Sequence, residues 1–238
     1  TSRPLYALLF LLPLVVIYEL GTLWINTDQV ANALIQKRVV TFIWLFNLGR
    51  WTGIPRSLVW AFPGFMVIVI LLCWHLASRR PWRVRPVWLG WMALESVIFT
   101  APLLLLNTAI GSSTRAAATA SGTQSYLAHL VTSIGAGIYE ELIFRFILFG
   151  LIVMVMENVL KVKHSGAVIL AVFVSAALFA AHHYVGIDSL NLEPFSLDGF
   201  IFRTLAGIYF ALIFSCRGYG VTAGTHAAYN VILITLWP

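Results

Sequence analysis

Two adjacent carboxylates, Glu140 and Glu141, lie in a stretch that is otherwise typical of a membrane helix, and Arg145 follows one helical turn after Glu141. A charge near the bilayer centre costs about 3 kcal/mol or more, and ionisable groups within a membrane are functional by default. Residues four apart share a helix face, so Arg145 can pair with Glu141. Glu140 points about 100° away. The pattern predicts that Arg145 holds Glu141 in place while Glu140 faces a cavity as a general base.

Two further motifs place histidines in apolar segments of the second half of the chain. His183 ends one apolar segment, with His182 beside it as an alternative candidate. His226 and Asn230 are four residues apart, so they project from one helix face and their N–H groups can bind an oxyanion. A glutamate and a histidine could hold and deprotonate a water, so these residue types favour a hydrolytic site that needs no serine or cysteine nucleophile.

The composition indicates which elements must position these residues. The chain has 238 residues, is 60% hydrophobic and 10% charged, and has a mean hydropathy of +0.90. Each span needs about 20 apolar residues, so the length allows roughly seven or eight spans. We therefore predict an all-α, polytopic transmembrane bundle that encloses a polar catalytic cavity. The expected helices cover residues 4–25, 39–48 (interfacial), 57–77, 86–110, 125–160 (one helix or two), 165–184, 199–216 and 221–237.

The chain is expected to form a single integral domain with two parts. Residues 1–122 hold N-terminal transmembrane helices with the interfacial helix, and residues 123–238 form the catalytic transmembrane core. The net charge is +6. The basic residues lie in short loops between apolar segments, as in other multi-pass proteins, so membrane lipid rather than nucleic acid is the expected partner. Glu95 and Arg203 are interpreted as a charge pair between helices, without a chemical role.

The order Glu-Glu-x-x-x-Arg, Phe-x-x-x-His and His-x-x-x-Asn on successive apolar helices resembles the CPBP family. These are the CAAX-protease and bacteriocin-processing intramembrane proteases, which include the CAAX prenyl endopeptidase. The resemblance covers the chain from about Ser125 to the C-terminus, and the first half gives no comparable signal. The matching positions are Glu140, Glu141, Arg145, Phe179, His183, His226 and Asn230.

The resemblance implies a role for each motif residue. Glu140 and His183 would activate water, and His226 with Asn230 would form the oxyanion hole, while the other two polar residues of the first motif would be structural partners. The implied protein is a glutamic-type endopeptidase without a cofactor. It would cleave the tail or membrane-anchored segment of a protein or peptide substrate. A prenylated tail, a secreted peptide and a C-terminal sorting anchor all stay open as substrates. We expect a multi-pass protein of the bacterial cytoplasmic membrane.

Three alternatives to a metal-free protease remain open at this point. Two histidines and a glutamate, here His183, His226 and Glu140, also form a known catalytic zinc set, although the sequence has no His-Glu-x-x-His and Asn230 would be a poor zinc ligand. The same buried charges could line the path of an ion or proton transporter, although a proton relay has little need of an amide at Asn230. A catalytically silent scaffold or immunity factor is the third.

Overall fold

The computed structural model describes residues 3–26, 39–55, 58–110, 123–184 and 195–236, and every regular element in these ranges is a helix. This confirms the predicted all-α fold. In chain order the helices are α1 (Pro4–Asn26), α2 (Val40–Trp51), η2 (Val59–Ala61), α3 (Phe62–Ala77), α4 (Val87–Ile98), α5 (Ala101–Ile110), α6 (Thr123–Glu141), η4 (Leu142–Phe149), α7 (Gly150–Asn158), α8 (His164–His182), α9 (Leu197–Arg217) and α10 (Tyr219–Leu236).

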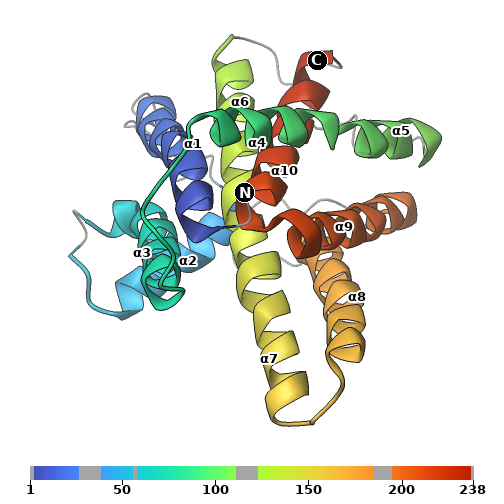
Figure 1. Ribbon diagram of the computed structural model, residues 1–238. Coiled ribbons are helices and arrows are strands. Elements are labelled where there is room, and N and C mark those ends of the chain that lie inside the picture. Colours follow the sequence, from blue (N-terminus) through green and yellow to red (C-terminus); the bar gives the residue numbers. More distant parts are fainter. Residues whose placement is uncertain (1–2, 27–38, 56–57, 111–122, 185–194, 237–238) are drawn as a thin grey trace.

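One continuous helical column stands at the centre of the molecule and is formed by α6, η4 and α7 (Figure 1). From the sequence, this segment could be either one helix or two. The structure shows a single helix whose middle, Leu142–Phe149, has a π-helical turn. Such turns are rare and occur often at functional sites. Here the π-helical turn begins directly after Glu141 and contains Arg145.

The stretch 86–110, expected to be one helix, is two. α4 ends at Ile98 and α5 begins at Ala101, with Phe99 and Thr100 between them. Proline has no backbone N–H and its ring clashes with the carbonyl four residues earlier, so Pro102 disfavours a helix that continues through Ile98, although α1 accommodates Pro13. The sequence therefore contains a local feature that favours the break.

Five helical stretches of the described chain are long and apolar enough to cross a membrane. They are Pro4–Ile25, Val59–Ala77, Val87–Ile110, His164–His182 and Leu197–Arg217. Large apolar side chains on these stretches are exposed, among them Leu20, Phe65 and Phe173. Exposed apolar faces of this kind suit contact with lipid, and the protein is an integral membrane protein. α6 and α10 are not among the five, and both contain several polar residues, which include those of the predicted site.

Two close helix contacts bring the motif-bearing helices together. α6 packs along α10, and α8 packs along α9. At Gly137 of α6, an added Cβ would lie 2.6 Å from the carbonyl oxygen of Ala223 in α10. At Gly207 of α9, it would lie 3.0 Å from the Cα of Ala176 in α8. Glycine at these two positions lets the backbones approach closely enough for side chains of four helices to meet at one site.

Candidate active site

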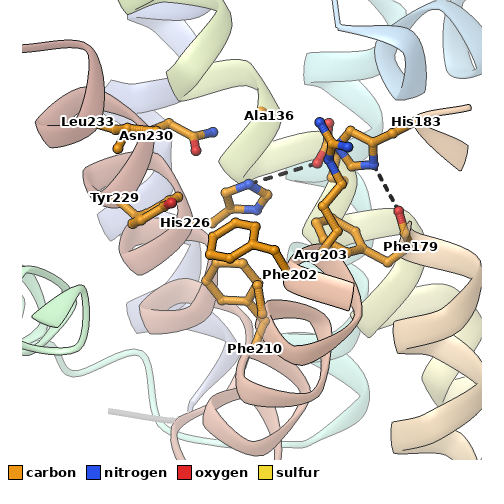
Figure 2. A pocket seen from close by; sticks show the side chains of 12 residues that line it. Ala136, Phe179, His183, Phe202, Arg203, Phe210, His226, Tyr229, Asn230 and Leu233 are labelled. Carbon is orange, nitrogen blue, oxygen red and sulfur yellow. Dashed lines mark hydrogen bonds and ion pairs between the residues drawn. The ribbon is translucent and has the colours of Figure 1, made fainter. Parts of the chain in front are cut away.

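A pocket of about 250 Å³ opens between α6, α8, α9 and α10. Figure 2 shows His226, Tyr229 and Asn230 on the α10 side and His183 on the opposite side. The residues that line it are Ala136, Glu140, Phe179, His183, Phe202, Arg203, Ala206, Phe210, His226, Tyr229, Asn230 and Leu233. Four of the six residues predicted to do chemistry therefore share one cavity, and aromatic and aliphatic side chains form most of its remaining wall.

The other two predicted residues form a fully buried ion pair behind the pocket. The Nε atom of Arg145 lies 3.2 Å from Oε2 of Glu141, and both side chains are completely inaccessible to solvent. The second carboxylate oxygen, Oε1 of Glu141, lies 2.7 Å from Nδ1 of His226. Glu141 therefore connects α6 to α10 and holds the His226 ring by one of its two nitrogens.

Arg145 is itself held on three sides. Its Nη2 donates to the carbonyl oxygen of Gly207 at 3.1 Å, and its Cζ lies 4.2 Å from the ring centroid of Phe179 and 5.4 Å from that of Phe210. A guanidinium over aromatic faces gains cation–π attraction, which increases when water is excluded. The phenylalanine of the second motif thus has a physical role, because it covers the cation that pairs with Glu141.

His226 is oriented so that its second nitrogen faces the other carboxylate. Its ring stacks on Phe210 with a centroid distance of 4.6 Å and an interplanar angle of 20°. Its Nε2 lies 3.8 Å from Oε2 of Glu140. With Nδ1 bound to Glu141, the ring places its second nitrogen towards Glu140 at the pocket.

His182 and His183 both approach Glu140 from the end of α8. Their Nδ1 atoms lie 2.5 Å and 2.9 Å from the carbonyl oxygen of Phe179. A carbonyl only accepts, so both Nδ1 atoms carry a proton and each Nε2 is an acceptor in the neutral ring. Nε2 of His182 lies 3.7 Å from Oε1 of Glu140, but only His183 lines the pocket.

The same group has the composition of a metal site. One donor atom from each of Glu140, His182 and His183 lies within 4.8 Å of the other two, and no other such group occurs in the described part of the chain. Histidines whose Nδ1 is hydrogen-bonded and whose Nε2 is available are typical metal ligands, so these residues fit a divalent cation. The set differs from the zinc set considered from the sequence, because it contains His182 in place of His226.

Two pocket residues were missed by the motif reasoning. Arg203 of α9 was interpreted as the partner of Glu95. This was wrong, because Oε1 of Glu95 lies 2.5 Å from Nη2 of Arg217. Arg203 instead lines the pocket and donates from Nη1 to the hydroxyl of Tyr184 at 2.7 Å. Tyr229 lies inside the His-x-x-x-Asn motif, where only the first and last residues had been assigned a role. The signal for Arg203 was present, since a charge within a span is functional by default.

Comparison with known protein families agrees with this geometry. Residues 122–232 match the family described as type II CAAX prenyl endopeptidase Rce1-like. This segment, which contains every motif residue, belongs to that family within the CPBP intramembrane proteases. Comparison with curated proteins and with solved structures gives no match.

The family assigns the class of activity. The match supports an intramembrane CAAX-type endopeptidase, and proteases of this family act on peptide substrates at membranes. This favours hydrolysis over the transporter and scaffold alternatives.

Proposed function

We propose that this protein cleaves the tail or membrane-anchored segment of a substrate protein by attack of a water molecule that Glu140 and His183 activate. The observation that carries the proposal is that Glu140, His183, His226 and Asn230 line one pocket while Glu141 and Arg145 lie buried behind it. We also propose that the protein is located in the bacterial cytoplasmic membrane.

The spacing of Glu140 and His183 suits a bound water. A carboxylate oxygen of Glu140 and a ring nitrogen of His183 lie within 4.8 Å of each other. Two hydrogen bonds of about 2.8 Å each can span such a gap when they meet at one water oxygen. In this arrangement Glu140 accepts a proton as the water oxygen attacks the carbonyl carbon of the scissile bond. The same proton then passes from Glu140 to the amide nitrogen as the carbon–nitrogen bond breaks.

His226 and Asn230 supply donors for the oxyanion in this scheme. The Asn230 amide donates an N–H, and His226 donates from Nε2 while Nδ1 donates to Glu141. A histidine donates from both nitrogens only as the imidazolium. The Glu141 carboxylate accepts from Nδ1 and orients the ring, as an acidic residue does for the histidine of a catalytic triad. Arg145 pairs with Glu141 and holds it in place.

We propose that the reaction proceeds without a metal ion, because the pocket holds both a base and oxyanion donors. The alternative is a divalent cation held by Glu140, His182 and His183, which would supply a Lewis acid at the carbonyl. The metal-free scheme needs His226 as an oxyanion donor, and it is supported by the fact that His226 lines the pocket and is not one of the three residues of the ligand group.

Cleavage of a peptide panel tests the function and shows which class of substrate is cleaved. Purified protein in detergent is given fluorogenic peptides that carry a prenylated tail, a secreted-peptide segment or a C-terminal sorting anchor. We expect one class to be cleaved, and Glu140→Gln to reduce kcat by about 10²–10⁴-fold, the usual contribution of a general base. Glu157→Gln, in the exposed contact with His164, is the matched control. Equal rates for wild type and Glu140→Gln would contradict the proposal.

A further inference from the structure

A second cavity lies between α1, α4, α6 and α10, and it shares no lining residue with the pocket of the candidate active site. Its volume is about 530 Å³, within the range of roughly 300–1,000 Å³ that is usual for ligand sites. Every residue that lines it is apolar or a glycine except Ser96, whose hydroxyl donates to the carbonyl oxygen of Met92 at 2.8 Å. The cavity therefore suits a ligand made of hydrocarbon.

The cavity is a groove whose rim faces the membrane. Pro13 of α1 and Ala93 and Val97 of α4 line it and are exposed. Both helices belong to stretches that are long and apolar enough to cross a bilayer, so the exposed rim meets lipid tails. Leu89, Ala93 and Val97 are four residues apart and form a wall about 12 Å long, since a helix rises 1.5 Å per residue. A wall of this length suits an extended acyl chain.

One end of the groove is fixed by a contact between two of its walls. The backbone N–H of Arg85 donates to the hydroxyl of Tyr6 at 3.1 Å. Tyr6 lies about one turn before Phe10 in α1, and Arg85 lies four residues before Leu89 of α4. Phe10 and Leu89 both pack against the apolar cluster that contains Tyr6. The loop that precedes α4 is therefore held at this end of the groove.

That loop carries four exposed arginines, which are Arg79, Arg80, Arg83 and Arg85. None of them forms an ion pair within the described part of the chain, and the sequence has no Asp or Glu at positions 1–18 or 74–94. The Trp82 ring packs edge-on against the buried His75 ring at a centroid distance of 4.5 Å, which holds the loop against α3. This end of the groove therefore carries positive charge without nearby acidic residues in the loop or its two flanking walls.

We propose that the groove binds an anionic phospholipid, with the phosphate at the arginine loop and one acyl chain along α4. Trp82 and Trp88 are exposed beside the arginines, and tryptophan is enriched at the headgroup level of a membrane. Clusters of four or more basic residues next to a span attract anionic lipids, and a guanidinium binds phosphate by paired hydrogen bonds. The loop thus selects the headgroup, and the groove holds the chain.

One wall of the groove is the back of the helix that carries the proposed oxyanion donors. Ala227 and Ala228 of α10 line the groove, whereas His226 and Asn230 line the pocket of the candidate active site. A bound acyl chain packs behind α10 and stabilises the folded protein, because it binds the folded state alone. The inference does not depend on the proposed function, since it concerns a different cavity and is tested by binding.

Native mass spectrometry in detergent with two lipids tests the headgroup. Dioleoyl phosphatidylglycerol is anionic and dioleoyl phosphatidylcholine is zwitterionic, and both have the same chains. We expect wild type to bind one phosphatidylglycerol more tightly than phosphatidylcholine. Arg80→Gln together with Arg85→Gln should weaken phosphatidylglycerol binding by about 5-fold for each arginine, the usual contribution of a basic residue near an anionic headgroup. Equal Kd values for the two lipids, or a preference that survives these substitutions, would overturn the inference.

The matched control for charge is Lys161→Gln together with Lys163→Gln. These two lysines are also exposed, and they lie in the loop before α8. They are distant in sequence from the groove and do not line it. This variant should keep the preference of wild type for phosphatidylglycerol, and a loss as large as that of the arginine variant would show that net charge alone attracts the lipid.

A variant that fills the groove tests the place of the acyl chain. Ala93→Phe puts a ring into the groove, so the Kd of both lipids should rise by about 10-fold or more, the contribution of two buried methylene groups. Ala177→Phe changes an exposed alanine of α8 that lines neither cavity, and it should leave both Kd values unchanged. If the arginine variant loses binding and Ala93→Phe does not, the lipid adsorbs to the loop alone and the groove is not its site.

Thermal unfolding separates loss of binding from loss of folding. In detergent without added lipid, the arginine and Ala93→Phe variants should unfold at the temperature of wild type. Added phosphatidylglycerol should raise the unfolding temperature of wild type and of the two control variants, and raise it less for the arginine and Ala93→Phe variants. Equal shifts in all of these proteins would contradict a lipid site at this groove.

The same spectra distinguish two other occupants of the groove. Displacement of phosphatidylglycerol by a prenylated peptide, but not by the same peptide without its prenyl group, would assign the groove to the lipid tail of a substrate. A dimer that Ala93→Phe dissociates would assign it to a second copy of this chain. Either result would overturn the assignment to a lipid of the bilayer.

Discussion

The carboxylate of Glu141 lies 2.7 Å from Nδ1 of His226, and this contact joins the two helices that carry the proposed base and the proposed oxyanion donors. The other oxygen of Glu141 faces Arg145. Glu141 is completely buried and does not line the pocket. Its proposed function is therefore to orient His226 rather than to contact the substrate.

Glu141→Gln keeps the shape of this side chain and removes its charge. We expect kcat to fall by about 10²–10³-fold, the cost of losing one oxyanion donor, because the His226 ring then loses the carboxylate that holds it in place. KM should change little, since the ground-state substrate does not contact Glu141. Steady-state kinetics with the best peptide measure both constants, and Glu95→Gln is the control. A raised KM with unchanged kcat would contradict this role.

Arg145→Met breaks the buried ion pair. Removal of one partner leaves an uncompensated buried charge on Glu141, which typically costs 3–5 kcal/mol of stability. We expect thermal unfolding in detergent to begin at a markedly lower temperature. Arg83→Met, at an exposed arginine, should lie within about 0.5 kcal/mol of wild type. Equal unfolding curves for the two variants would show that the pair contributes no stability.

His183 and His182 are expected to differ when each is replaced by alanine. His183 lines the pocket, so His183→Ala should reduce kcat by about 10²-fold or more. The His182 ring packs against the rings of Phe144 and Trp44, with centroid distances of 4.7 Å and 6.0 Å. His182→Ala should therefore reduce thermal stability more than activity. Rates and unfolding temperatures of both variants test this. The reverse order of activity losses would assign the role to His182.

Gly137→Ala tests the close approach of α6 and α10. The new Cβ would meet backbone atoms, with the carbonyl oxygen of Ala223 at 2.6 Å and the amide nitrogen of Ala227 at 2.7 Å. The helices must separate, so we expect a loss of about 1–3 kcal/mol. Activity should also fall, because the contact between Glu141 and His226 lengthens.

Gly150→Ala is the matched control in the same helical column. An added Cβ there meets nothing within 4 Å. Alanine is favoured over glycine in an exposed helix by about 1 kcal/mol, so this variant should be as stable as wild type or more stable. If both substitutions had the same effect, the close approach at Gly137 would not matter for the fold.

Most of the helices, and the polar residues that mark the candidate site, could be predicted from the sequence because each is a local pattern. Glu140, His183 and His226 were predicted because polar groups in apolar helices are costly. The break before Pro102 could also have been predicted from local chemistry, although the apolar run 86–110 suggested a single span.

The pairing between helices could not be predicted in this way. Spacing within a helix places Arg145 beside Glu141, but it does not say which helix approaches the other carboxylate oxygen. The contact of Glu141 with His226, and of Glu95 with Arg217, depends on how α6, α4, α9 and α10 pack. That Arg203 and Tyr229 line the pocket is likewise known only from the packing of the helices.

Cleavage in the presence of a metal chelator, compared between wild type and Glu140→Gln, tests the central claim most directly. The account predicts that wild type retains its rate after extensive chelation and that kcat of the variant stays about 10²–10⁴-fold lower under all conditions. Loss of the wild-type rate on chelation, with recovery when a divalent cation is returned, would contradict it. That result would make Glu140, His182 and His183 ligands of a catalytic metal instead.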